Sequence, residues 1–177
     1  MQTEKVILAG GCFWCIEPVF KKLNGVLSVV SGYTGGKTSN PTYDDICTGQ
    51  TGHAEALAIE FDNSQITLAQ LLEVFFTIHD PTTLNRQGAD IGTQYRSAVF
   101  YSSEAQKTAV QDAIAKANQA AIWSNPIVTS LEPVAEFYPA EQYHQDFFSK
   151  NPSNRYCQFS VIPKLKKLDE LFSKLQQ

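Results

Sequence analysis

The stretch VILAGGCFWCI, residues 6–16, decides how the rest of the chain is interpreted. Its apolar start is typical of a short buried strand, and the Gly-Gly pair that follows is a flexible turn. A helix is expected next, ending at Asn24-Gly25. Pro18 limits where that helix starts, because proline is tolerated only in a first turn, where its missing N–H would be unpaired. The sequence therefore predicts a first turn at about residues 15–18, with Cys12 just before the helix.

Local patterns further along predict a mixture of strands and helices. Strands are expected at residues 26–33, 54–61, 97–101, 127–132 and 156–162, the second of them half-buried because its apolar residues alternate. Helices are expected after the N-caps Thr67 and Ser103, the latter reaching about residue 122, and at residues 143–148 and 164–175. Residues 80–94 are polar and aperiodic, which indicates a functional loop. The expected fold class is α+β: a two-layer α/β sandwich with a mixed sheet, with a ferredoxin-like core and a C-terminal extension.

Length, charge and hydropathy limit the classes of function. With 177 residues and 43% hydrophobic composition, we expect residues 1–177 to form a single catalytic domain. A net charge of −4 without a basic stripe argues against binding to nucleic acid. The longest apolar run is too short for a membrane helix and lacks the features of a signal peptide. A cytoplasmic protein is therefore expected, whose four cysteines stay reduced unless they act as redox groups.

Cys12 lies where a thiol can be activated. The unpaired N–H groups and positive dipole end of the following helix favour a thiolate. The two glycines before Cys12 leave room for another molecule, because they carry no side chain. Cys15 is three residues further on, and a C-x-x-C pair at a helix start can meet the Cα separation that a disulfide requires. Packing of both cysteines in the core is the competing interpretation.

Two other kinds of cysteine site compete with a catalytic dithiol of this type. Structural zinc takes four ligands, and Cys47 and His53 would complete such a set only by accident of folding, so no metal is expected. A thioredoxin motif carries glycine, proline or histidine between its cysteines, whereas Phe13 and Trp14 stand there in this chain. Two aromatic residues beside a nucleophilic sulfur predict a small apolar pocket, although they could equally pack in the core.

The chain also resembles one protein family over nearly its whole length. GGCFWC at residues 10–15 is similar to the active-site signature of the peptide methionine sulfoxide reductases of the A type, which act on the S epimer. The likeness continues in order through SGYTGG (31–36), NPTY (40–43), TGHAEA (51–56), HDPT (79–82), GTQYRSA (92–98) and EQYHQ (141–145). One such motif alone would be weak evidence for the family, whereas a series of motifs in the same order is specific evidence.

Sulfoxide reduction requires a nucleophile for the sulfur, an acid for the oxygen and a pocket for the carbon atoms. Cys12 would be the nucleophile, and Glu55 is the best acid, since partial burial on an otherwise apolar strand would raise its pKa. The resemblance implies the remaining roles: hydrogen bonds to the sulfoxide oxygen from Tyr43 and Tyr95, contact with the substrate main chain by Asp90, a substrate-side position for His144, and a methyl pocket made by Phe13 and Trp14.

Attack would leave Cys12 as a sulfenic acid, which a second thiol converts to a disulfide that an external dithiol reduces. Cys15 is close in sequence, and family members with this C-x-x-C form can use it. Cys157 resembles the recycling cysteine of other members, but the Gly-rich tail that carries it there is absent, and residues 158–164 look like a strand that runs into a helix. We therefore favour Cys15 and expect Cys47 to pack in the core.

The leading hypothesis is a methionine-S-sulfoxide reductase that repairs oxidised proteins and also acts on free methionine sulfoxide. It would bind no cofactor, use thioredoxin as partner and reductant (or dithiothreitol in vitro), and work as a monomer. Two alternatives are a general thiol–disulfide oxidoreductase that uses Cys12 and Cys15, and a zinc-stabilised binding module.

Overall fold

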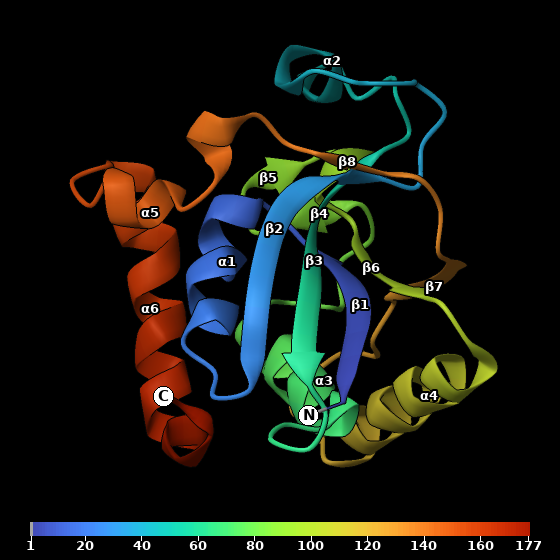
Figure 1. Cartoon of the computed structure of the whole chain (residues 1–177), viewed down its shortest axis with the longest axis vertical. Coiled ribbons are helices and arrows are strands. Elements are labelled where there is room, and N and C mark those ends of the chain that lie inside the picture. Colours follow the sequence, from blue (N-terminus) through green and yellow to red (C-terminus); the bar gives the residue numbers. More distant parts are fainter. Residues whose placement is uncertain (1) are drawn as a thin grey trace.

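The computed structural model describes residues 2–177, and Figure 1 shows a curved sheet with helices packed around it. Six strands follow the order β7-β6-β1-β3-β2-β8, and every neighbouring pair is antiparallel except β6 and β7. The strands of this sheet are β1 (Thr3–Gly10), β2 (Val26–Thr34), β3 (Ala54–Asp62), β6 (Ser97–Tyr101), β7 (Ser130–Pro133) and β8 (Phe137–Pro139). A separate hairpin pairs β4 (Arg86–Gln87) with β5 (Asp90–Ile91).

The helices complete a ferredoxin-like core and its extension. The α-helices are α1 (Phe13–Lys21), α2 (Tyr43–Cys47), α3 (Leu68–Ile78), α4 (Glu104–Gln119), α5 (Phe147–Lys150) and α6 (Arg155–Phe172), and the 3-10 helices are η1 (Thr93–Tyr95), η2 (Gln142–His144) and η3 (Ser173–Leu175). The elements β1-α1-β2-β3-α3-β6 with the strand order β6-β1-β3-β2 form the split βαβ arrangement of that core. The predicted α+β class with a mixed sheet is confirmed.

The two faces of the sheet carry side chains of different size. On β3, Leu57, Ile59 and Phe61 pack beneath the helices in the main core, while Ala54 and Ala56 contact a second cluster on the opposite face. The prediction of a half-buried strand holds only in the second half of β3, where Ala58 and Glu60 are partly exposed; at Ala54 and Ala56 both faces are covered. Because side chains alternate along a strand, residue 55 shares the helix-covered face of residues 57, 59 and 61.

Several sequence predictions are confirmed by local structure. Thr67 caps α3 in a capping box with Gln70, and Ser103 caps α4 by accepting the N–H of Gln106. The strands expected at 26–33 and 97–101 are β2 and β6. Helix α4 ends three residues before the predicted limit, and only the last part of the strand expected at 127–132 forms, as β7.

Three other predictions are wrong or incomplete. Helix α1 begins at residue 13, so that Pro18 lies in its second turn and the helix loses one internal hydrogen bond. Residues 156–162 are not a strand but the first half of α6, whose buried Cys157, Val161 and Leu168 recur at helical spacing beside α1 (Figure 1). The loop expected at residues 80–94 contains the β4–β5 hairpin and η1.

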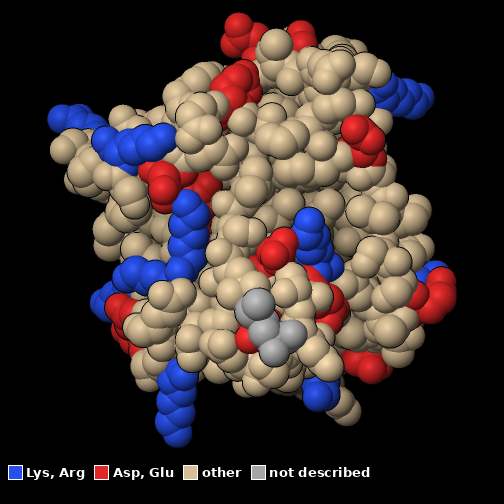
Figure 2. Space-filling view, viewed as in Figure 1, with Lys and Arg blue, Asp and Glu red and all other residues tan. Residues whose placement is uncertain are grey.

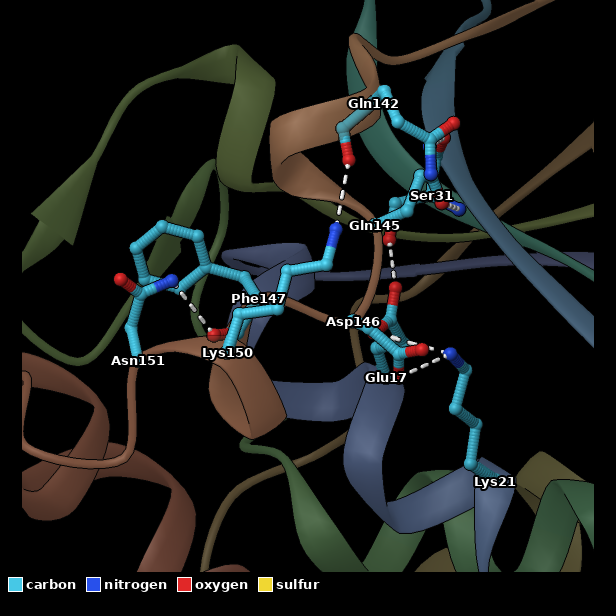
Figure 3. A network of polar contacts seen from close by, with 9 residues as sticks. All are labelled: Glu17, Lys21, Ser31, Gln142, Gln145, Asp146, Phe147, Lys150 and Asn151. Atoms are coloured by element: carbon cyan, nitrogen blue, oxygen red, sulfur yellow. Dashed lines mark hydrogen bonds and ion pairs between the residues drawn. The ribbon is translucent and has the colours of Figure 1, made fainter.

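Polar contacts fix the segment of residues 141–151 against α1 and β2 (Figure 3). The Gln145 side-chain amide donates to the Ser31 carbonyl at 2.8 Å and accepts the Ser31 N–H at 2.9 Å, as a neighbouring strand would. The buried carboxylate of Glu17 accepts the Ser31 hydroxyl at 2.7 Å, and Lys21 donates to Asp146 at 2.5 Å. These contacts place η2 and α5 over the start of α1.

The distribution of charge on the surface agrees with the small net charge of the sequence. The face shown in Figure 2 carries basic and acidic side chains interspersed over a largely uncharged surface, with no extended patch of one sign. Within residues 2–177, no helix is long and apolar enough to cross a membrane.

Gly11 is required at the turn between β1 and α1. Its φ is +94°, a region that disfavours side chains, and a Cβ there would lie 2.5 Å from Cγ of Gln87. The Gln87 side chain is fixed by hydrogen bonds to both backbone polar groups of Asp80. The space beside Gly11 is thus filled by this chain itself, whereas Gly10 lines a groove that also reaches Cys12. The predicted room for another molecule is therefore absent at Gly11 but present at Gly10.

We predict that Gly11→Ala lowers the free energy of unfolding by about 1–3 kcal/mol from backbone strain, with a further loss from the clash with Gln87. Gln87→Ala removes the contact with Cγ at 2.5 Å but keeps the one with Cβ at 2.8 Å, so it should reduce the cost of Gly11→Ala in part in the double variant. Urea unfolding of the four proteins measures this. Additive losses in the double variant would show that Gln87 does not restrict this turn.

Candidate active site

Cys12 lies at the junction of β1 and α1, as predicted. It is the N-cap residue of α1 with extended backbone angles, it is 8% exposed, and its carbonyl accepts the Cys15 N–H at 3.0 Å. No side chain caps the helix at this position. The first free N–H of the helix, that of Phe13, points instead to the sheet below.

Glu55 occupies the sheet position beneath that helix start. It pairs with Tyr33 across β2 and β3, is 1% exposed, and accepts the Phe13 N–H at 3.1 Å. Burial raises the pKa of its carboxyl to about 8, despite the opposing effect of the Phe13 hydrogen bond. Glu55 is therefore mostly protonated at neutral pH, which is the state that a proton donor requires.

Tyr43 and Tyr95 flank the same carboxyl from two separate segments. Tyr43 begins α2, and its N–H is fixed by Glu141 at 2.9 Å; Tyr95 ends η1. Burial raises the pKa of both phenols and the nearby Glu55 raises it further, so that both remain hydrogen-bond donors. The Arg96 guanidinium, which donates to the carbonyls of Gly52 and Thr93, ties η1 to the loop before β3.

An aromatic cluster borders Cys12 on the side of Trp14. The Trp14 indole N–H donates to Nδ1 of His144 at 2.9 Å, and Phe147 stacks on the indole at 3.7 Å between ring centroids. Phe13 and His144 are fully buried behind Trp14, and the Tyr43 ring lies 4.4 Å from that of His144. Trp14 thus provides the accessible part of the apolar wall, while Phe13 and His144 support it from behind.

Asp90 lies in the β4–β5 hairpin. The Tyr156 hydroxyl donates to its carboxylate in a short hydrogen bond that bridges the hairpin and α6. Asp90 and Tyr156 line a groove of about 320 Å³ that also reaches Cys12 and Cys15. The groove and the aromatic cluster meet at Tyr156, whose ring lies 6.4 Å from that of Trp14.

Three of the four thiols gather in one cluster. Cys12, Cys15 and Cys157 pack together with Val161 of α6, and all three cysteines are reduced and buried. The Cys12 thiol donates to Cys15, which lowers the pKa of Cys15, while burial raises the pKa of Cys12. Burial also raises the pKa of Cys157 to about 11. Of the first two cysteines, Cys15 is therefore the one that loses its proton more readily.

Two predictions about the cysteines are wrong. The helix start does not favour a thiolate at Cys12 in this structure: burial outweighs the one favourable contact, from the Trp14 N–H, and the Phe13 N–H is occupied by Glu55. Cys47 does not pack in the core but is exposed at the end of α2. In residues 2–177, no group of three or more His, Cys, Asp or Glu side chains is placed to hold a metal ion.

The sequence prediction of the site missed Phe147 and the polar face of α6. Phe147 lay inside a predicted helix without any chemical signal. Tyr156, Ser160 and Lys164 border the groove but fell in and just beyond the region taken for a strand. Their spacing of four residues was the available signal, since it places them on one face of a helix.

Comparisons with known proteins agree with this geometry. The family model of peptide methionine sulfoxide reductase matches residues 4–176. The peptide methionine sulfoxide reductase MsrA of Clavibacter michiganensis is 53% identical over 173 residues, which cover 98% of this chain and 97% of that protein. The reduced crystal structure of Mxr1 from Saccharomyces cerevisiae superimposes with a TM-score of 0.82 at 38% identity, covering 88% of this chain and 90% of that one. A structure of Mxr1 in complex with Trx2 superimposes with a TM-score of 0.59 at 29% identity and covers 82% of this chain and 85% of that one.

The buried Glu55 carboxyl predicts a pH dependence of stability. Because its pKa in the folded state is raised to about 8, the folded state retains a proton that the unfolded chain releases above about pH 4. The free energy of unfolding should therefore fall as the pH rises towards 8, by about 3 kcal/mol from this group alone between pH 4.5 and 7.

Glu55→Gln should remove this slope, and chemical unfolding at several pH values measures it. Glu60→Gln is the matched control, because Glu60 lies on the same strand with a side chain that reaches solvent. Parallel pH profiles for wild type and Glu55→Gln would show that the carboxyl is already ionised at neutral pH.

Proposed function

The chain belongs to the peptide methionine sulfoxide reductase family of oxidoreductases, and on this premise we propose that Cys12 attacks the sulfoxide sulfur while Glu55 protonates its oxygen. The observation that carries this assignment is the buried carboxyl of Glu55 beneath the Cys12–Phe13 junction, fixed by the Phe13 N–H at 3.1 Å. A nucleophile and a neutral acid thus lie side by side at one helix start.

The first step transfers the sulfoxide oxygen to Cys12. The Cys12 sulfur bonds to the substrate sulfur while Glu55 protonates the oxygen, and the thiol proton of Cys12 restores the Glu55 carboxyl. The hydroxyl then passes to the Cys12 sulfur as the substrate S–O bond and the new S–S bond both break. Methionine leaves reduced by two electrons, and Cys12 becomes a sulfenic acid. The phenols of Tyr43 and Tyr95 are oriented by α2 and η1 to donate to the oxygen, while Trp14 borders the methyl group.

The second step forms a disulfide. The Cys15 thiolate attacks the sulfenic sulfur of Cys12, the S–S bond forms, and the oxygen departs as hydroxide, which takes a proton to become water. The hydrogen bond between the two thiols supports Cys15 in this role, whereas Cys157 is buried in the first turn of α6, where its N–H is bound by Asn154. A member of the family has been solved in complex with Trx2, which supports thioredoxin as the dithiol that reduces the disulfide.

The substrates we propose are methionine-S-sulfoxide in proteins and as the free amino acid. His144, fully buried behind Trp14, would act by fixing the indole, and Asp90 would meet the substrate main chain at the mouth of the groove. The match of one family model to residues 4–176 supports a single catalytic domain, and we propose that it works as a monomer. The cytoplasmic location stays a prediction from the sequence.

We expect Cys12→Ser to abolish the production of methionine from methionine-S-sulfoxide with dithiothreitol as reductant. Glu55→Gln should lower the rate by about 100-fold or more, the usual contribution of a positioned acid. Asp112→Asn, on α4 far from the thiols, is the control and should retain activity. Undiminished turnover by Cys12→Ser would exclude the mechanism. If the protein were instead a general dithiol oxidoreductase, it would reduce insulin disulfides, and Glu55→Gln would leave that activity unchanged.

The identity of the second thiol is tested by Cys15→Ser and Cys157→Ser. With thioredoxin as reductant, we expect Cys15→Ser to stop after one turnover and Cys157→Ser to continue. Both should still form one equivalent of methionine in a single turnover, because the first step needs only Cys12. Loss of thioredoxin-coupled turnover in Cys157→Ser alone would assign the second thiol to Cys157.

A further inference from the structure

One face of α6 presents three polar side chains to the thiols. Tyr156, Ser160 and Lys164 are four residues apart, so they lie above one another on the helix surface. All three line the groove of about 320 Å³ together with Cys12 and Cys15. The mechanism described so far assigns no role to Ser160 or Lys164.

Two members of this polar face can stabilise a negative charge on Cys15. Ser160 and Lys164 line the groove with Cys15, and the hydroxyl of Ser160 and the charge of Lys164 both lower the pKa of the Cys15 thiol. The Tyr156 proton is already shared with Asp90, which leaves Ser160 and Lys164 as the uncommitted donors.

Lys164 has no other obvious counter-charge. Among residues 2–177 it forms no ion pair with a carboxylate, although it is only partly exposed and its pKa is lowered by burial. A half-buried ammonium group without an anionic partner is unfavourable. The thiols are the groups that raise its pKa, which is the effect of negative charge at their sulfur atoms.

We propose that Lys164, aided by Ser160, is the positioning residue that holds Cys15 as a thiolate, ready to attack the Cys12 sulfenic acid. The role rests on the proposed function, since it deepens the step in which Cys15 resolves the oxidised Cys12. Lys164 acts through Cys15: it lowers the free energy of the attacking thiolate. The S–S bond then forms as the S–O bond breaks, and the departing hydroxide gains a proton to become water.

Other titratable groups face this pair from every element that packs against it. The groups around Cys15 are Cys12 at the start of α1, Glu55 on β3, and Tyr156 and Cys157 on α6. The groups around Lys164 are the neutral buried His79 after α3 and Lys167 on α6. The carboxylate of Asp90 on β5 lines the same groove and accepts the Tyr156 hydroxyl. Glu55 is neutral at pH 7, Cys157 is a thiol, and Lys167 lies over the Trp123 ring at 4.7 Å. Of the two lysines in this set, Lys164 is therefore the one that lines the groove with the thiols.

The direct test is the pH dependence of alkylation of the reduced protein by iodoacetamide, with the modified site identified by mass spectrometry. We expect Lys164→Met to raise the apparent pKa of Cys15 by about one unit, which is a tenfold slower reaction below that pKa. Lys164→Arg should retain the wild-type profile, because it retains the charge. Lys166→Met, an exposed lysine on the same helix, is the matched control.

A second measurement follows the sulfenic acid after mixing with one equivalent of methionine sulfoxide. Lys164→Met should form methionine at the wild-type rate but convert the sulfenic acid to the disulfide about tenfold more slowly at pH 7, with the rate recovering at high pH. Superimposable alkylation profiles for wild type and Lys164→Met would overturn the proposal, and so would a loss of rate that high pH does not restore. Because alkylation requires no turnover, it tests Lys164 even if the sulfoxide chemistry proposed above fails.

Discussion

One buried hydrogen bond determines the layout of the site: the Phe13 N–H donates to the carboxyl of Glu55 at 3.1 Å. It joins the start of α1 to the central strand β3 in a place that water does not reach, so the carboxyl keeps its proton at neutral pH. The same bond occupies the helix N–H that would otherwise stabilise a thiolate at Cys12. Proton donor and nucleophile are thereby fixed next to each other, each in its protonated form.

The remaining groups reach this centre on segments that are far apart in the sequence. Tyr43 depends on the hydrogen bond between its N–H and Glu141, and Tyr95 on the guanidinium of Arg96. The segment of residues 141–151, fixed to β2 by Gln145, places Phe147 against Trp14. The short helices α2 and η1 thus carry the two phenols proposed to contact the substrate, while β3 and the start of α1 carry the proposed acid and nucleophile.

The sequence predicted helices and site residues correctly where the local signal and the tertiary structure agree. Thr67 has a capping partner three residues later, and Glu55 stands out as a carboxyl on an apolar strand. It predicted the wrong secondary structure where tertiary packing outweighed the intrinsic preference of the residues for strand. Residues 156–162 are rich in β-formers, yet they are helical because Cys157 and Val161 fit against the thiol cluster. The position of Pro18 within α1 was also predicted wrongly. The prediction assumed that proline must lie in the first turn, whereas α1 tolerates the one hydrogen bond that Pro18 removes.

The central claim, that Glu55 is a neutral acid beneath the nucleophile, is tested most directly by infrared difference spectroscopy of wild type against Glu55→Gln. The account predicts the carbonyl stretch of a protonated carboxyl group at pH 7, which gives way to carboxylate bands as the pH rises through about 8. A difference spectrum that shows only carboxylate bands at pH 7 would contradict it, because an ionised Glu55 could not protonate the sulfoxide oxygen.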